Sequence, residues 1–171
     1  MTAETTVAES SLDTVEGIIA ALDRPYDGLL AEEALRAAQS RRSEIVPGLI
    51  SLLERETNAA RAGETDFGEG ALFALHLLAE FGAREALPAV IDAVSLPGEL
   101  PFDLFSDTIT ESLGAMLAAL TDVPPDRIDA LIRNRQANEY VRSAASESYE
   151  CLVRDERLPR LQAAERLRGH L

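Results

Sequence analysis

The segment Pro47-Gly48-Leu49-Ile50-Ser51-Leu52-Leu53 places apolar residues at helical spacing directly after a proline, and this pattern decides the fold class. Proline is favoured in the first turn of a helix, because its missing N–H would have no intrahelical partner there. The same combination returns after Pro88, follows Pro125 with a shift of one residue, and weakens after Pro159. The intervals between these prolines are 41, 37 and 34 residues. The sequence therefore predicts a repeated unit with a helix starting at each proline.

Each of these helices is preceded by a segment that carries its own apolar stripe at helical spacing, which predicts a helical hairpin. The preceding segments cover residues 29–40, 70–82, 103–120 and 138–153, and the helices after the last two prolines are expected near 126–133 and 156–168. Another helix is expected from Leu12 to Leu22, and residues 57–70 read as a loop. No segment alternates with the two-residue period of a strand, so no strands are expected.

Hairpins of about 35 to 40 residues are typical of HEAT and armadillo units. The predicted fold is all-α, a short right-handed α-solenoid of about four HEAT-like helical hairpins, with an irregular helical bundle as the alternative. Residues 10–171 are expected to form this single domain, and residues 1–9 a disordered tail.

The chain is strongly acidic, and its charge is unevenly distributed. The net charge is −14, and all 16 basic residues are arginines. Residues 1–111 contain 21 acidic residues and 7 arginines, whereas residues 112–171 contain nine of each. Proteins that bind nucleic acid or anionic membranes do so with basic residues. We therefore expect no nucleic-acid and no membrane partner, and a protein partner that is basic or arginine-rich.

Three segments, Phe73–Phe81, Asp107–Gly114 and Asn138–Ala145, follow Tyr26-Asp27-Gly28-Leu29 and Ile45-Val46-Pro47 in order. Together they resemble the bacterial domain-of-unknown-function family 1186, whose members are interpreted as HEAT-like helical repeats. The resemblance spans residues 25–153 and implies a fold but no activity. Some relatives carry a C-terminal cysteine-rich zinc motif for protein contacts, which this chain, with a single cysteine, is expected to lack.

Candidate binding residues lie on two of the predicted helices. Asp103, Asp107 and Glu111 are spaced four residues apart, which would place three carboxylates on one stripe of a long helix. The helix of Glu139, Tyr140 and Arg142 is predicted to neighbour that stripe. Arg142 could then pair with Asp107 or Glu111, or Tyr140 and Arg142 could line a small ligand pocket. The candidate binding residues are Asp107, Glu111, Glu139, Tyr140 and Arg142.

No catalytic residues, metal ligands or cofactor are predicted. The chain has two histidines, of which His76 is expected as a core residue and His170, at the chain end, receives no role. It has neither the paired-histidine helix motif of zinc proteases nor a glycine-rich phosphate loop. Its first residues, Met1-Thr2-Ala3-Glu4, lack the basic and apolar regions of a signal peptide, so a cytoplasmic location is expected.

These observations favour a scaffold module that binds another protein through an acidic solenoid surface, since solenoids present extended surfaces for contact. Two alternatives stay open. One is a small-molecule or cofactor binder, or an enzyme, built on the same scaffold. The other is a self-assembling structural domain that forms homo-oligomers.

Overall fold

The computed structural model describes residues 12–25 and 28–170, and this part of the chain is predominantly helical without any strand. The predicted all-α class is therefore confirmed, while the predicted tail over residues 1–9 lies outside the described residues. The helices, in chain order, are α1 Val15–Leu22, α2 Glu32–Ser40, α3 Arg42–Ala62, α4 Gly70–Phe81, the 3-10 helix η1 Arg84–Ala86, α5 Leu87–Val94, α6 Leu100–Phe105, α7 Thr108–Glu111, α8 Leu113–Leu120, α9 Asp126–Arg133, α10 Glu139–Arg154 and α11 Arg160–Arg168.

Local sequence signals set several helix ends. Thr14 begins α1, and its Oγ1 accepts a hydrogen bond from the backbone N–H of Gly17 at 3.1 Å. Asn138 begins α10 in the same way, through a 2.9 Å hydrogen bond from the N–H of Tyr140. Side-chain caps of this kind satisfy N–H groups that have no partner inside the helix. At the other end, α3 stops at Gly63, where φ is +89°, a left-handed conformation that glycine adopts without strain.

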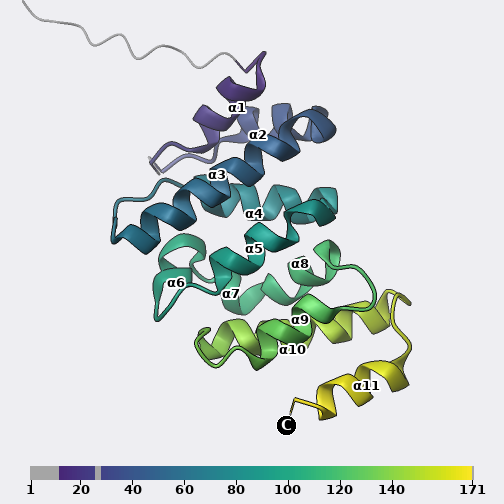
Figure 1. The fold of residues 1–171 in the computed structure, drawn as a ribbon. Helices are drawn as coiled ribbons and strands as arrows, with labels where there is room; N and C mark the ends of the chain where they lie inside the picture. Colours follow the sequence, from purple (N-terminus) through teal and green to yellow (C-terminus); the bar gives the residue numbers. More distant parts are fainter. Residues whose placement is uncertain (1–11, 26–27, 171) are drawn as a thin grey trace, which may run out of the picture.

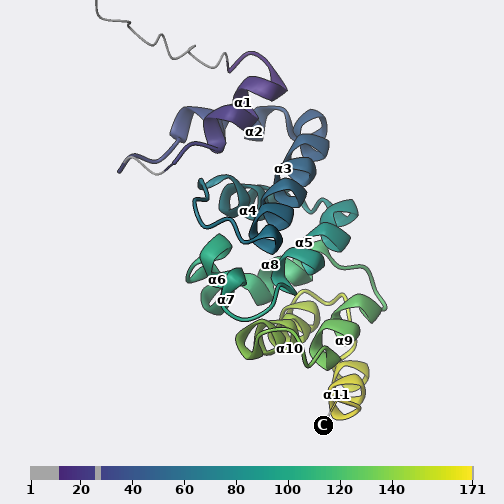
Figure 2. The same cartoon turned by 60° about the vertical axis from the view of Figure 1, so that its left-hand side comes forward.

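The helices are stacked in chain order from one end of the molecule to the other. Figure 1 shows α1 and α2 at one end and α11 at the other, and Figure 2 shows the same succession after rotation. The most extensive contacts join α8 with α10, α3 with α4, and α9 with α10, and α4 also contacts α8. Elements thus pack mainly on neighbours close in the sequence, layer upon layer.

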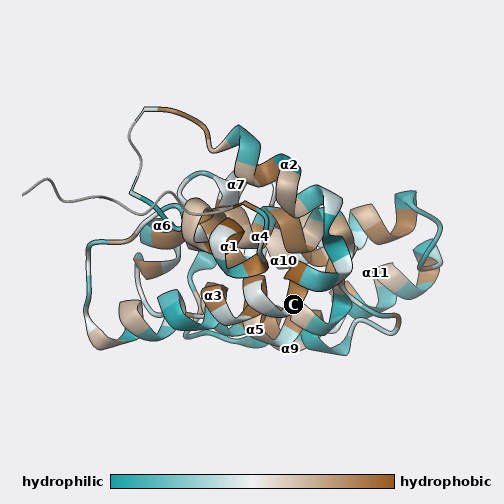
Figure 3. Ribbon diagram, turned by 90° about the horizontal axis from the view of Figure 1, so that it is seen from above, coloured by the Kyte–Doolittle hydropathy of each residue, from teal (hydrophilic) through white to brown (hydrophobic). Residues whose placement is uncertain are grey.

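A continuous apolar core runs through this stack. Leu49, Leu53, Leu75 and Leu78 have no exposed surface, and alanines at the helix crossings are buried with them. Figure 3 shows hydrophobic residues gathered toward the middle of the stack and hydrophilic residues on its outside. At the crossing of α8 and α10, a Cβ on Gly114 would lie 2.9 Å from the carbonyl oxygen of Ala144. The glycine is therefore what lets these two helices approach so closely.

The single long helix expected over residues 103–120 is wrong. Ser106 has φ +48° and ψ −140°, and Ser112 has φ −143°, so the chain forms α6, α7 and α8 instead of one helix. The apolar stripe itself is preserved, because Phe105, Ile109 and Leu113 are fully buried. The two breaks allow these apolar residues to be buried from three short helices. They also remove the single helical face that was predicted for the carboxylates of Asp103, Asp107 and Glu111.

The prediction for the third helix also needs correction. Pro47 lies inside α3, five residues after its start at Arg42, and not in the first turn. α3 continues to Ala62 through residues that read as a loop, because Thr57 and Ala60 are buried against the core. Pro88 is confirmed at the start of α5, and Pro125 and Pro159 directly precede α9 and α11.

Ion pairs connect the layers at matching positions. The layers are α2 with α3, α4 with η1 and α5, α6–α8 with α9, and α10 with α11. The first members of three pairs are residues 42, 84 and 126, which are spaced 42 residues apart and begin α3, η1 and α9. Their partners lie in the following layer. The first two pairs place arginine first, and the third exchanges the charges. The pairs are Arg42–Glu80 at 3.2 Å, Arg84–Asp122 at 2.9 Å and Asp126–Arg166 at 2.9 Å.

Candidate functional site

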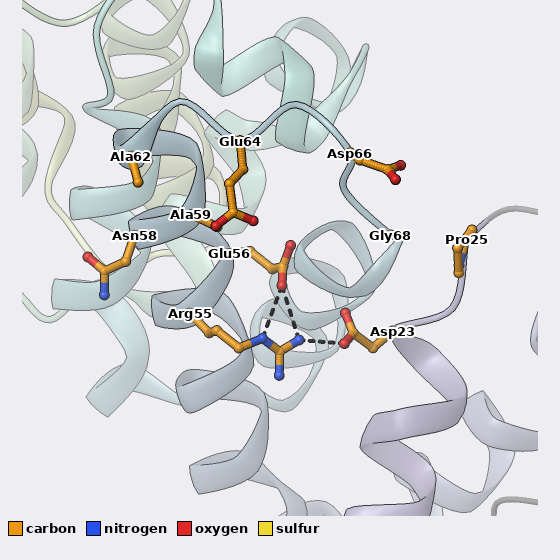
Figure 4. Close-up of a pocket in the computed structure, with 10 residues that line it drawn as sticks. All are labelled: Asp23, Pro25, Arg55, Glu56, Asn58, Ala59, Ala62, Glu64, Asp66 and Gly68. Atoms are coloured by element: carbon orange, nitrogen blue, oxygen red, sulfur yellow. Dashed lines mark hydrogen bonds and ion pairs between the residues drawn. The ribbon is translucent and has the colours of Figure 1, made fainter. Parts of the chain in front are cut away.

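A pocket of about 620 Å³ opens between the end of α1, the second half of α3 and the loop that joins α3 to α4. We call it the acidic pocket, because its lining contains four carboxylates and one arginine. Figure 4 shows the α3 side chains and the loop residues around it. Its lining residues are Asp23, Pro25, Arg55, Glu56, Asn58, Ala59, Ala62, Glu64, Asp66 and Gly68.

Arg55 joins two of the carboxylates on one side of the pocket. Its Nε and Nη2 donate to Glu56 Oε1 at 3.1 and 3.0 Å, and Nη2 also donates to Asp23. Figure 4 shows the guanidinium between both acids. Partial burial acts to lower the pKa of Arg55, but the hydrogen bonds and charges of Glu56 and Asp23 outweigh burial and raise it. Arg55 is therefore a fixed positive charge that offsets one of the two negative charges on this side.

The loop reaches the end of α1 because glycines stand at the closest contacts. A Cβ on Gly68 would lie 2.5 Å from the backbone oxygen of Asp23, and a Cβ on Gly70 would lie 2.3 Å from its Oδ1. Side-chain carbons do not occupy such short distances, so any other residue would push the loop away. The glycines thus set the width of the acidic pocket.

The other two carboxylates, of Glu64 and Asp66, are exposed. Within the described residues neither carboxylate accepts a hydrogen bond or forms an ion pair. Figure 4 shows the Glu64 side chain turned toward Glu56 across the pocket. In the same part of the chain, no group of three or more histidine, cysteine, aspartate or glutamate side chains is arranged to hold a metal ion. The arrangement suits a cationic group, such as a guanidinium, that donates several hydrogen bonds.

The residues predicted as binding candidates are only partly brought together. α7 and α10 are in contact, as expected, and Asp107 and Glu111 are exposed at the two ends of α7. However, Arg142 forms no ion pair with either of them, and within residues 12–25 and 28–170 its side chain has no hydrogen-bond partner. The expected pair across the layers is therefore absent, because Arg142 faces α11 and not α7.

Glu139 and Tyr140 are separated in a similar way. Glu139 lies on the side of α10 that faces α11, together with Arg142. Tyr140 is 52% exposed, and its ring meets Phe102 of α6 edge to face, with 5.9 Å between the ring centres. The hollow that Arg142 lines beside α11 does not include Tyr140. Tyr140 instead offers an apolar surface next to α6.

Both histidines differ from their expected positions. His76 is exposed and not in the core, with Nε2 3.2 Å from Thr108 Oγ1, and partial burial lowers its pKa. His170, which received no role, is the more deeply placed residue, since only 6% of its side chain is exposed. Its Nε2 lies 2.9 Å from Asp129 Oδ1. The end of the chain is therefore tied to α9.

Asp129 is the centre of a polar cluster that the sequence pattern did not reveal. It also accepts hydrogen bonds from the Tyr149 hydroxyl of α10 and from Arg166 Nη1 of α11, the latter at 2.5 Å. Burial acts to raise the pKa of Asp129, but these hydrogen bonds and the charge of Arg166 outweigh it and lower the pKa. The partners of Asp129 lie 20 to 41 residues further along the chain. Only a comparison of residues about one repeat apart would therefore have indicated them.

Comparison with known proteins identifies relatives of the whole described region. A family model with the description "Protein of unknown function (DUF1186)" matches residues 14–169. An uncharacterized protein of Chlamydia muridarum is 35% identical over 151 residues, which are 87% of this chain and 60% of that protein. One of Chlamydia trachomatis serovar D is 34% identical over 151 residues, with 87% and 59% covered. The chain thus spans about three fifths of the length of these relatives. No solved structure shows a significant match.

One further property concerns the helices alone. Throughout the described ranges, none of them combines the length and the apolar character needed to cross a lipid bilayer.

Proposed function

This chain belongs to the family described as a protein of unknown function (DUF1186), and from its surface we propose that it is a protein-interaction module. In this proposal the stacked layers form a short right-handed α-solenoid of HEAT-like hairpins. The solenoid carries no chemistry of its own. It presents an acidic surface to a basic or arginine-rich segment of a partner protein.

The layered contacts support the solenoid part of the proposal. Apart from the Tyr149–Asp129 hydrogen bond, the polar contacts between layers named above join residues 31 to 41 positions apart, as do those between Arg61 and Asp92 or Asn138 and the carbonyl oxygen of Gly98. Recurring separations in this range are what repeated hairpins of this length produce. Such a stack offers a surface along its whole length, because each layer covers only its neighbours.

The acidic pocket is the observation that carries the function. Two of its four carboxylates, those of Asp23 and Glu56, are already paired with Arg55, whereas Glu64 and Asp66 have no partner in the described part of the chain. An arginine side chain of a partner could donate to Glu64 while its stem packs on Ala59 and Ala62, which also line the pocket, and a second basic group could pair with Asp66, which Figure 4 shows pointing away from Glu64. Because the groups are exposed, the interaction should weaken with rising salt.

The proposal is tested with a fluorescently labelled Arg-Ser-Arg-Ser-Arg peptide and a Glu-Ser-Glu-Ser-Glu counterpart, titrated with the full chain at 50 and 300 mM salt. We expect the arginine peptide alone to bind, and more weakly at the higher salt. The double variant Glu64→Gln with Asp66→Asn should lose at least about tenfold in affinity, the effect of one lost charge-assisted hydrogen bond.

Matched variants distinguish binding in the acidic pocket from binding to the overall negative charge of the protein. Glu33→Gln with Glu85→Gln removes the same charge from two exposed positions outside the pocket and should bind as the parent chain does. An equal loss in both double variants would assign binding to diffuse charge and reject the pocket. A loss confined to Asp107→Asn with Glu111→Gln would move the binding surface to α7. Sedimentation of the chain alone at both salt concentrations tests the self-assembly alternative.

A further inference from the structure

A second site of opposite character lies at the other end of the stack, in a groove between α10 and α11. Two adjoining hollows of about 620 and 670 Å³ form it, and they share Ser143, Ser146, Ala164 and Leu167. We call this the C-terminal groove. Ile132 extends its apolar surface at one end and Val153 at the other. The groove is therefore long enough for a stretch of polypeptide and largely apolar along its length.

Two buried nitrogen atoms without partners belong to residues that line the first hollow. They are Arg142 Nε and His170 Nδ1. Almost every buried polar group in a folded protein has a hydrogen-bond partner, and leaving one unpaired is destabilising. A ligand that offers an acceptor to Arg142 Nε and a second polar group to His170 Nδ1 would complete both residues.

His170 is held in place for such a contact. Its side chain is 94% buried, and Nε2 lies 2.9 Å from Asp129 Oδ1, which is itself bound by Tyr149 and Arg166. An ionised carboxylate only accepts hydrogen bonds, so Nε2 carries the hydrogen. Rotation of the ring would break this bond, so Nδ1 is the unpaired nitrogen of the ring, and it accepts a hydrogen bond.

The charges around the first hollow favour an anion at one point only. Arg142 and Arg168 line it, and neither forms an ion pair within the described residues. Glu139 lies beside them, and in the second hollow Glu147 and Glu150 are balanced by Arg154 and Arg160. A uniformly acidic ligand would meet these three carboxylates. A ligand with a single carboxylate and apolar side chains fits both the arginines and the apolar surface.

We propose that the C-terminal groove binds a peptide segment of a partner protein that carries one carboxylate between Arg142 and Arg168, a backbone N–H that donates to His170 Nδ1, and apolar side chains along Leu167 and Val153. Arginine presents a planar fork that matches a carboxylate, and the apolar contacts add affinity without adding charge. The C-terminal groove differs from the acidic pocket in its position and in the sign of its binding charge. The proposals for the two sites can therefore be tested independently.

The test uses two labelled peptides, Glu-Leu-Ala-Leu-Leu and Gln-Leu-Ala-Leu-Leu, with acetylated N-termini and amidated C-termini, titrated with the full chain. We expect the glutamate peptide to bind saturably and the glutamine peptide at least about tenfold more weakly. Arg142→Gln should abolish that preference, and Arg142→Lys should restore only part of it. Arg133→Gln removes an exposed arginine of α9 outside the groove and should leave the preference unchanged. Urea unfolding of each variant establishes that it is folded.

The proposal is overturned if the glutamate peptide does not bind saturably, or if both peptides bind equally well. It is also overturned if Arg133→Gln loses as much of the preference as Arg142→Gln does. A further contradicting result would be a salt-dependent dimer of the chain alone that Arg142→Gln dissociates. Such a dimer would show that the groove binds a second copy of this chain and not a partner protein. If glutarate displaces the labelled peptide as effectively as the unlabelled glutamate peptide does, the groove is a small-molecule site. This result also contradicts a peptide ligand.

Discussion

His170 Nε2 lies 2.9 Å from Asp129 Oδ1, although 41 residues separate the two in the chain. This contact ties the last described residue to α9, and Tyr149 and Arg166 bind the same carboxylate from α10 and α11. One side chain therefore joins the final three helices. α11 has few other anchors, since Ala163 is its one buried residue and Leu161 is 80% exposed.

Replacing Asp129 by alanine should destabilise the protein strongly. The change leaves the Tyr149 hydroxyl and His170 buried without an acceptor, and we expect the free energy of unfolding to fall by about 3 kcal/mol. Urea unfolding followed by circular dichroism measures it. Asp126→Ala is the control, because this partner of Arg166 is 73% exposed and should contribute less than about 1 kcal/mol. Similar losses in both variants would contradict a central role for Asp129.

The same carboxylate should make stability depend on acid pH in a defined direction. The pKa of Asp129 is lower in the folded protein than its ordinary value. Its ionised form therefore adds stability at all pH values above the unfolded pKa of about 3.9, and this stability is lost as the pH falls through the folded pKa. The difference in unfolding free energy between the parent chain and Asp129→Asn should stay constant from pH 7 to about pH 5 and shrink below about pH 4. A difference that persists unchanged at pH 3 would show that ionisation of Asp129 does not stabilise the fold.

Gly68→Ala should disturb the acidic pocket. The new Cβ would meet the backbone oxygen of Asp23 at 2.5 Å, which the loop can relieve only by moving away, and overpacking of this kind costs about 1–3 kcal/mol. Gly48→Ala is the control, because its Cβ would meet only side-chain carbons of Ile19 and Val15 at 3.3 Å or more, inside a helix that favours alanine. Thermal unfolding should place Gly68→Ala well below the parent chain and Gly48→Ala close to it or above.

Arg157→Met should lower stability at the end of α8. Nη1 and Nη2 of Arg157 donate to the carbonyl oxygens of Ala118 and Thr121, the last of which has 1% of its residue surface exposed. Both carbonyls lie where helix α8 ends and lacks its own donors. Methionine keeps most of the apolar stem, so the expected loss of about 2 kcal/mol in urea unfolding reports on the hydrogen bonds. Arg154→Met, which removes an exposed pair with Asp155, should have little effect.

The sequence was sufficient for elements whose signals are local. The ends of α9 follow from the prolines before it and its apolar spacing, and they agree with the prediction at 126 and 133. The expected helix over 70–82 is α4, which ends at Phe81 before Gly82. These features depend on residues a few positions apart, which a single sequence displays directly.

Elements fixed by distant residues were not predictable in this way. The apolar spacing through Phe105, Ile109 and Leu113 is the same for one helix or for three, and only the packing of α10 on α7 and α8 decides between them. Asp129 looks like an ordinary surface acid beside Ile128 and Leu131 until α11 folds over it. Likewise, Arg142 was placed on the right helix, but the side of the helix it occupies follows from the position of α11.

The order of charges in the three ion pairs between layers also restricts how this chain could have gained or lost hairpins. If the layer of α4 and α5 were deleted, Arg42 would face Asp122, and the joint would keep an attractive pair. If the layer from α6 to α9 were deleted, Arg84 would face Arg166, and like charges would meet at the seam. Removal of the second layer would thus retain the attraction between layers, whereas removal of the third would replace an attraction by a repulsion. Because each exposed pair contributes at most about 1 kcal/mol, the order of charges is a weak preference that favours duplication or loss of the second layer over the third.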